Sequence, residues 1–290
     1  MMEGLIIKGI GGFYYVRAEG GAIYQCRARG AFRKDGITPT VGDVVDFQIL
    51  DDEEGVVHRI WPRKNIFVRP PVANVDCFIV MMAAACPAPN LEILDRFIVA
   101  AERANTEVII CLNKVDLSDP EDVRKISEIY RTCYTVEEVS CATGLGIDKL
   151  SRWLMGKRCA LAGPSGVGKS TLLNIFQHDL KLETGEVSDK TKRGKHTTRH
   201  VELFLMEEFG AWVFDTPGFT SFETSGLTAD ELAFCYPDIW RYSRECRFSN
   251  CRHVYEPDCR VTKAVKEKEI AVSRYESYLR QLEEIGGGRY

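Results

Sequence analysis

Hydrophobic and polar residues follow different patterns in three successive parts of the chain. Residues 4–61 contain five short runs rich in β-branched and aromatic residues, separated by Gly, Asp and Pro turns. These runs predict strands, and five strands in so short a segment favour a small barrel of the OB type. Such barrels commonly bind nucleic acids or sugars on one face, but a purely structural barrel fits the strand count equally well.

The second part alternates strand patterns with helix patterns. An apolar run at residues 77–84 precedes a helical pattern at residues 90–105, and strands and helices continue to alternate up to residue 163. Two further strands are predicted at residues 200–206 and 211–215. This alternation predicts a parallel sheet with helices on both faces.

The third part, from residue 226, is mostly helical. It ends in a predicted long amphipathic helix whose apolar stripe comprises Val261, Ala264, Val265, Ala271, Tyr275, Tyr278, Leu282 and Ile285. With 290 residues, the chain is long for a single core. We therefore expect three domains: a barrel at residues 1–70, an α/β domain at residues 71–225 and a helical domain at residues 226–290.

The composition is typical of a globular protein, with 45% hydrophobic and 28% charged residues. No apolar stretch approaches the roughly 20 residues that a membrane span needs, and the N-terminal residues do not resemble a signal peptide. The 11 cysteines are an odd number, and several lie in predicted strands. This usage favours reduced thiols and a cytoplasmic protein.

The net charge of −4 hides four basic clusters, which make contact with a polyanion plausible. The alternative is that these residues only form solvated surfaces. The clusters are Arg27, Arg29, Arg33 and Lys34; Arg59, Arg63, Lys64 and Arg69; Lys190, Lys192, Arg193, Lys195 and Arg199; and Arg241, Arg244, Arg247, Arg252 and Arg260.

Residues 163–171 read GPSGVGKST and match the phosphate-binding pattern G-x-x-x-x-G-K-[ST]. An apolar strand pattern precedes them and a helix-forming run follows, as this loop requires. Its backbone N–H groups surround phosphate oxygens, Lys169 is expected to reach the β- and γ-phosphates, and Ser170 is expected to bind Mg²⁺. The predicted nucleotide contacts are Gly163, Pro164, Ser165, Gly166, Val167, Gly168, Lys169, Ser170 and Thr171.

The base is predicted to be guanine, read by Asn113, Lys114 and Asp116 in the segment NKVD. The Asp116 carboxylate can accept two hydrogen bonds that guanine donates and adenine does not. Alone, this segment could be a strand end with incidental polar residues. The loop SCATG after the next predicted strand strengthens the assignment, because a backbone N–H there can reach the guanine O6. Its predicted contacts are Ser140, Cys141 and Ala142.

Two further segments complete a nucleotide site. Asp215 and Gly218 in DTPG follow an apolar strand, where the carboxylate can hold the Mg²⁺ shell and the Gly218 N–H can reach the γ-phosphate. The polar segment KTKRGKHTTRH, residues 190–200, is predicted to be a switch loop. In this class of enzyme a threonine of that loop binds Mg²⁺ while the γ-phosphate is present, and either Thr197 or Thr198 fits this role.

The residue after Gly218 is Phe219, where many GTPases have a glutamine that orients the attacking water. Phe219 cannot hydrogen-bond to water. His196 in the predicted switch loop is the expected catalytic residue, since an imidazole can do so near neutral pH. It could instead be a loop histidine without a role, or one that contacts RNA phosphate.

The last cluster is C-x4-C-x-H-x5-C, formed by Cys246, Cys251, His253 and Cys259. Three thiolates and an imidazole make a complete tetrahedral zinc set with no open position, so we expect one structural Zn²⁺ per chain. The alternative is a chance grouping in a cysteine-rich chain.

The base motif precedes the phosphate loop here, which is the reverse of the usual GTPase order. The segments VANVD, NKVDL, GPSGVGKST, RGKHTTRH, DTPGF and C-x4-C-x-H-x2-EP-x-C together resemble the bacterial ribosome small subunit-dependent GTPase A family, the RsgA type of circularly permuted GTPase. The resemblance covers essentially the whole chain. It implies an N-terminal OB-fold barrel, a permuted P-loop GTPase domain and a C-terminal zinc-binding helical domain.

The resemblance also implies what the protein does. It implies GTP hydrolysis to GDP with Mg²⁺, late in assembly of the small ribosomal subunit, with contact to its rRNA and stimulation by that subunit. It assigns the hydrolytic role to His196, although many members have three threonines after this histidine and the third position here is Arg199. We expect a monomer without a membrane partner. The alternatives are an RNA-binding module whose nucleotide only regulates docking, and an ATP-dependent kinase.

Overall fold

The computed structural model describes residues 1–184, 201–219 and 226–286, except residues 31, 33–35, 52 and 69, and for residues 178–184 and 216–219 it describes the backbone alone. The chain forms two compact units. The first unit contains Met1–Cys77, Ser151–Leu161 and Ser170–Phe219, and the second contains Phe78–Leu150, Ala162–Lys169 and Thr220–Tyr290. Each unit combines stretches that are far apart in the sequence, so the units do not test where one domain ends along the chain. The domain boundaries expected at residues 70 and 225 remain predictions. Among the helices of the described residues, none is both long and apolar enough to cross a membrane.

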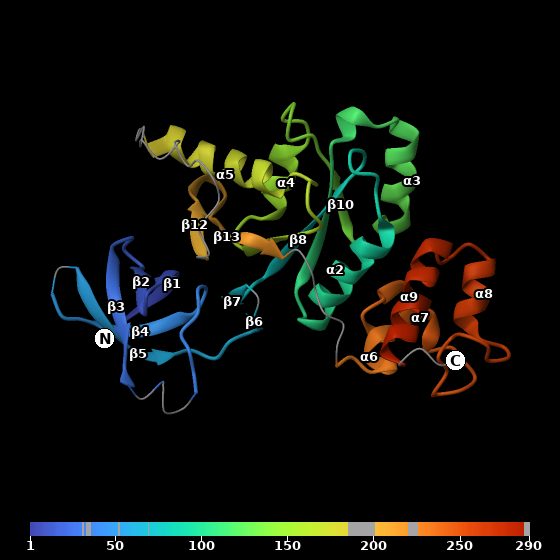
Figure 1. Cartoon of the computed structure of the whole chain (residues 1–290), viewed down its shortest axis with the longest axis horizontal. Helices are drawn as coiled ribbons and strands as arrows, with labels where there is room; N and C mark the ends of the chain where they lie inside the picture. The colour runs from blue at the N-terminus through green and yellow to red at the C-terminus, as the bar shows by residue number, and fades with distance from the viewer. Residues whose placement is uncertain are drawn as a thin grey trace. The chain divides into compact units, whose positions relative to one another are not determined.

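Five strands at the N-terminus form a closed barrel, which confirms the predicted OB-type fold (Figure 1). The strands are β1 (Met2–Ile10), β2 (Phe13–Ala18), β3 (Ile23–Ala28), β4 (Val44–Ile49) and β5 (Glu54–Ile60). They pair in the order β1–β2–β3–β5–β4–β1, with β3 and β5 parallel and the other neighbours antiparallel. Alternate apolar residues point inward and are fully buried, including Ile6, Val16, Cys26, Val45, Phe47 and Val57.

Strand β1 has two partners along one edge. Its first half pairs with β4, whereas Lys8 pairs with Glu202 of β12 (Glu202–Met206). A β-bulge between Ile6 and Lys8 separates the two halves. Strand β12 forms a hairpin with β13 (Ala211–Phe219) through the 3₁₀ turn Glu207–Phe209, so these two strands are antiparallel. The same unit contains most of β11 (Arg158–Ala162), next to β13, and most of α5 (Lys169–Thr184).

The segment VANVD begins within the short hairpin of β6 (Ile66–Val68) and β7 (Pro71–Ala73) and connects the barrel to the rest of its unit. Asn74 has a left-handed backbone (φ 57°). Its Oδ1 accepts the N–H of Lys64 at 2.8 Å and its Nδ2 donates to the Gly42 carbonyl at 3.0 Å. Asp76 Oδ2 accepts the N–H of Arg158 at 3.0 Å. These contacts give the segment a structural role.

The second unit contains the predicted alternation of strands and helices. Its strands lie in the order β10–β9–β8, and β9 and β10 are parallel. All residues of β8 are buried, as expected for a continuous apolar run covered on both faces. The elements that lie wholly or mostly in this unit before the C-terminal module are β8 (Cys77–Ala83), α2 (Leu91–Arg103), β9 (Glu107–Asn113), the 3₁₀ turn η1 (Val115–Leu117), α3 (Pro120–Arg131), β10 (Thr135–Glu138) and α4 (Ile147–Trp153).

The C-terminal module is helical, but the predicted single long helix is wrong. The structure has α6 (Ala229–Phe234), α7 (Pro237–Ser243), α8 (Arg260–Lys266) and α9 (Val272–Ile285). The break between α8 and α9 occurs where Lys268 adopts a left-handed backbone (φ 61°) and Glu269 donates its N–H to the Ala264 carbonyl at 2.9 Å. This turn buries Ile270, so both helices direct apolar residues into one core. Helix α9 packs against α2 (Figure 1).

Candidate nucleotide site and metal centre

Asn113, at the end of β9, joins the predicted base-reading loop to the phosphate loop. The side chain is buried, with 1% exposed. Its Oδ1 accepts the N–H of Cys141 at 3.0 Å, and its Nδ2 donates to the Val167 carbonyl at 2.8 Å. Three segments that are separate in the sequence, NKVD, SCATG and GPSGVGKST, therefore meet at one amide.

Lys114 lies against the phosphate loop. Its left-handed backbone (φ 64°) turns the chain sharply after β9. The ammonium then donates to the Gly166 carbonyl at 2.7 Å and to the Cys86 carbonyl. Cys86 also has a positive φ, of 48°. A side chain so held can cover one face of a base with its methylene stem.

Two glycines of the phosphate loop are required by close contacts. A Cβ on Gly168 (φ 105°) would lie 2.2 Å from Asn113 Nδ2, and one on Gly163 (φ 140°) would lie 2.3 Å from the Met81 carbonyl oxygen. Both backbone angles are also ones that only glycine adopts readily. The glycines of the motif therefore allow the loop to approach β8 and β9 closely.

Lys169, the first residue of α5, points back over the loop. Its ammonium donates to the carbonyls of Gly163 at 2.7 Å and Pro164 at 2.6 Å. Partial burial lowers the pKa of Lys169. Among the residues that the structure describes, both acceptors of this ammonium are neutral carbonyls. A cation held in this way and partly removed from water is well suited to bind an anionic phosphate.

The other predicted contacts of the second unit fall into buried and exposed groups. Ser140 is fully buried and its Oγ accepts the N–H of Thr143 at 3.2 Å, so it shapes the loop. Burial raises the pKa of Cys141 to about 11, so its thiol adds no negative charge to the base site near neutral pH. Val167 is buried and Pro164 is half-buried. The other four residues of this set are exposed: Asp116, Ala142, Ser165 and Gly166.

In the first unit, Asp215 near the middle of β13 faces α5. Its Oδ2 accepts a hydrogen bond from Gln177 Nε2 at 3.4 Å. Ser170 and Thr171 are exposed at the start of α5. Gly218 is the second-last residue of β13. The predicted switch residues His196, Thr197 and Thr198 lie outside the described residues.

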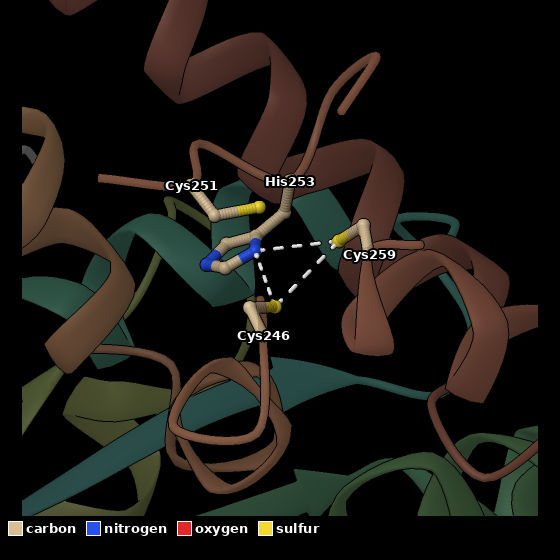
Figure 2. A group of neighbouring side chains, drawn as sticks. All are labelled: Cys246, Cys251, His253 and Cys259. Carbon is tan, nitrogen blue, oxygen red and sulfur yellow. Dashed lines mark hydrogen bonds between the residues drawn. The ribbon is translucent and has the colours of Figure 1, made fainter. Parts of the chain in front are cut away.

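The four predicted metal ligands converge in the C-terminal module (Figure 2). Their donor atoms lie within 4.8 Å of one another. The Cys246 sulfur is 3.6 Å from His253 Nδ1 and 3.9 Å from the Cys259 sulfur, which is 3.5 Å from the same nitrogen. Cys251 is the fourth member of the group (Figure 2). This cluster can hold a metal ion.

A cation is buried where α9 meets α2 and α7. Arg274, with 1% exposed, donates to Asp95 at 2.6 Å and to both oxygens of Asp238 at 3.0 Å. Its guanidinium lies over the Tyr236 ring, 4.5 Å from the centroid. Burial alone would lower the pKa of Arg274, but Asp238 and Asp95 raise it above its ordinary value, so the side chain stays charged.

Three participants were not expected from the sequence: the Cys86 carbonyl, Gln177 and Arg274. A carbonyl has no sequence signal. Gln177 lies seven residues after Ser170, which is about two helical turns, so both residues lie on the same face of the helix. This spacing could have predicted that Gln177 lies on the side of the helix that carries Ser170.

Two family models match the chain. The RsgA N-terminal domain matches residues 3–57 and the RsgA GTPase model matches residues 60–225. The small ribosomal subunit biogenesis GTPase RsgA of Caldanaerobacter subterraneus subsp. tengcongensis is 47% identical over 285 residues, which cover 98% of this chain and 96% of that protein. That of Agathobacter rectalis is 45% identical over 297 residues and covers 98% of both chains.

Solved structures are similar over the same length. The crystal structure of YjeQ from Thermotoga maritima has a TM-score of 0.86 and 35% identity, and the match covers 99% of each chain. The crystal structure of YloQ, a circularly permuted GTPase, has a TM-score of 0.85 and 37% identity, covering 100% of this chain and 96% of that one. The reversed order of base motif and phosphate loop is explained by such a permutation, and the chain belongs to the RsgA GTPase family.

Proposed function

We propose that this protein hydrolyses GTP and acts in the biogenesis of the small ribosomal subunit. The observation that carries the proposal is the Asn113 side chain, which connects a base-reading loop and a phosphate loop through two hydrogen bonds of 3.0 and 2.8 Å. The near full-length relatives that carry the name small ribosomal subunit biogenesis GTPase support the cellular role.

In this proposal Asp116 reads guanine and Lys169 binds the phosphates. Asp116 is exposed at the start of η1, where a ligand can approach its carboxylate. Lys169 exchanges its two loop carbonyls for β- and γ-phosphate oxygens, since hydrogen bonds between ions are stronger than those to neutral acceptors. The Cys141 N–H is held by Asn113, and the neighbouring loop backbone supplies the donor to guanine O6.

Ser170 and Asp215, with Thr197 or Thr198, would hold Mg²⁺. Hard oxygen donors of this kind suit Mg²⁺, which in nucleotide sites is bound by few protein ligands and keeps several waters. When bound, Mg²⁺ neutralises charge on the phosphates. The hydrogen bond from Gln177 to Asp215 points this carboxylate toward the face of α5 that also carries Ser170. His196 orients the attacking water.

The metal of the C-terminal cluster is proposed to be one structural Zn²⁺. Tetrahedral zinc with bonds of about 2.3 Å to sulfur and about 2.0 Å to nitrogen separates two sulfurs by about 3.8 Å and a sulfur from a nitrogen by about 3.5 Å. The separations among Cys246, His253 and Cys259 are 3.9, 3.6 and 3.5 Å. These three donor atoms are thus already spaced for this ion, and Cys251, whose sulfur lies within 4.8 Å of them, would fill the fourth position.

The barrel is proposed to contact rRNA. Arg27 lies over the Phe13 ring at 4.9 Å from the centroid, beside a hollow that Arg29 and Phe32 also line. Arginines and aromatic rings together suit the backbone and bases of single-stranded RNA. We further propose that the protein is a cytoplasmic monomer, which size-exclusion chromatography with light scattering would test.

The decisive experiment measures GTP turnover with and without purified small subunits. The expected result is slow turnover that small subunits increase and large subunits do not. Equal, negligible turnover in both cases would instead indicate a binding module whose nucleotide regulates docking. Transfer of phosphate from ATP to a substrate would indicate a kinase.

Base recognition is tested separately by Asp116→Asn. Loss of the hydrogen bonds to guanine should weaken GTP binding by about 1.5–3 kcal/mol, or roughly 10- to 150-fold. The matched control is Asp122→Asn on the nearby helix α3, which should leave the affinity unchanged. Equal affinities in the two variants would exclude Asp116 as the base-reading residue.

A further inference from the structure

Strand β1 directs one basic side chain out of the barrel. Gly4 and Ile6 are buried in the barrel interior, and in a regular strand Lys8 would point the same way. The bulge between Ile6 and Lys8 inserts one residue and reverses the alternation. The Lys8 ammonium therefore lies outside the barrel, where it forms an ion pair with Glu202, with Nζ and Oε2 3.0 Å apart.

Glu202 stands between Lys8 and Asp215. Lys8 is the register partner of Glu202 in β1 and β12, and Glu202 is the register partner of Asp215 in β12 and β13. Register partners in antiparallel strands have side chains on the same face of the sheet, with Cβ atoms about 4.5–5.5 Å apart. The three side chains form a row across three strands, which we call the charge row: one cation followed by two anions.

The charge row lies on the face of the sheet that α5 covers. This follows from the hydrogen bond between Gln177 of α5 and Asp215. Ser170 lies two turns before Gln177 on the same side of that helix. Glu202 therefore places a second negative charge next to the carboxylate proposed to hold Mg²⁺, and Lys8 neutralises it.

We propose that Lys8 and Glu202 are positioning residues that set the affinity of the nucleotide site for Mg²⁺, so that the barrel supplies one charge of that site. The inference rests on the proposed Mg²⁺-dependent GTPase function. Two strand spacings put Lys8 about 9–10 Å from Asp215, which is close to the Debye length in physiological salt. The side chains of Lys8 and Glu202 are 29% and 45% exposed, so solvent screens the interaction without abolishing it.

The two ends of the ion pair have opposite effects. Lys8→Met leaves the Glu202 carboxylate unpaired beside the cation site, so Mg²⁺ should bind about 2- to 5-fold more tightly. Glu202→Gln leaves the Lys8 ammonium unpaired, so Mg²⁺ should bind about 2- to 5-fold more weakly. The double variant should return close to the wild-type value. A role in folding alone would not produce shifts of opposite sign.

The test measures the release rate of fluorescent GDP from the full-length protein as a function of Mg²⁺ concentration. This gives the half-saturating Mg²⁺ concentration without requiring hydrolysis. The matched control is Lys125→Met, which removes one positive charge from the surface pair with Asp122 (3.2 Å) on α3, outside the charge row. Thermal melting followed by circular dichroism confirms that each variant is folded.

Opposite shifts in the two single variants, absent in Lys125→Met, are the expected result. If the wild type responds to Mg²⁺ but both single variants shift in the same direction, or neither differs from the control, the inference fails while the proposed function stands. A wild-type protein whose GDP release is independent of Mg²⁺ would overturn the inference and the proposed Mg²⁺ ligands, whereas the turnover assay with small subunits tests the GTPase function separately.

Discussion

The candidate nucleotide site and the C-terminal module hold their cations in opposite ways. In the module, Arg274 contacts two carboxylates of neighbouring helices, Asp95 and Asp238. In the nucleotide site, Lys114 and Lys169 donate to backbone carbonyls of nearby loops. A carbonyl has no net charge and is readily replaced by a phosphate oxygen, whereas nothing in solution can replace two buried carboxylates. Neutral hydrogen-bond partners therefore distinguish a cation that is available to a ligand from a cation that stabilises the fold.

Metal removal should have the largest effect on the module. Binding of structural zinc contributes an apparent 10–16 kcal/mol in zinc-finger peptides, on the order of the stability of a whole domain. Chelation, or Cys259→Ala, should therefore unfold the helices around the cluster while the nucleotide site still binds GDP. Circular dichroism and fluorescent GDP binding measure the two effects.

A matched control for metal removal is Cys235→Ala, because Cys235 is a buried thiol of the same module outside the metal cluster. It should retain the metal and lose only on the order of 1 kcal/mol. Equal damage from both substitutions would mean that the cluster stabilises the module by packing and not by metal binding.

Arg274→Met should be the next largest change. It leaves Asp95 and Asp238 as unpaired buried charges, which costs about 3–5 kcal/mol of unfolding free energy. Urea denaturation measures the loss, and GDP affinity should be unaffected in the folded protein. Arg280→Met on the same helix, whose side chain is 56% exposed, should change stability little. A loss from Arg274→Met no greater than from Arg280→Met would contradict the comparison.

Lys169→Met should show the reverse pattern. GTP affinity should fall by about 1.5–3 kcal/mol, because an ion-to-ion hydrogen bond is lost, while the unfolding free energy changes by less than about 1 kcal/mol. Isothermal titration calorimetry and urea denaturation separate the two quantities. A protein that unfolds without Lys169 would show that its carbonyl contacts are structural.

Arg96→Ala should give the smallest effect and sharpen the contrast within the module. Arg96 of α2 pairs with Glu284 of α9, with Nη1 and Oε2 2.8 Å apart, on the same helix pair as Arg274. Because its side chain is 25% exposed and screened by solvent, the loss should be below about 1 kcal/mol and smaller still in high salt. If Arg96→Ala lowered the unfolding free energy as much as Arg274→Met, burial would not determine how much an ion pair contributes to stability.

Local signals predicted most of the elements correctly. The runs rich in β-branched and aromatic residues predicted all five barrel strands, and the apolar run at residues 77–84 predicted the buried strand β8. The glycine spacing of the phosphate loop predicted a curled backbone, and Gly163 and Gly168 have the angles it requires. These features depend on residues within a few positions of one another, which a pattern can reveal.

Features that depend on distant partners were not predicted. The apolar stripe from Val261 to Ile285 continues across the break at Lys268, because two helices that face one core have the same periodicity as one long helix. Arg274 looks like a solvated helical residue until Asp95 is known to lie opposite. The pairing of Lys8 with Glu202 required both the bulge in β1 and the position of β12.

The divided strand β1 has a consequence for the order in which the protein is made. All barrel strands have been synthesised by Ile60, so the first half of β1 can pair with β4 early in translation. The partner of Lys8 is synthesised only at residue 202. Until then the second half of β1 has an unpaired edge, of the kind that other chains can join. A lysine at such an edge is one of the devices by which proteins oppose edge-to-edge pairing.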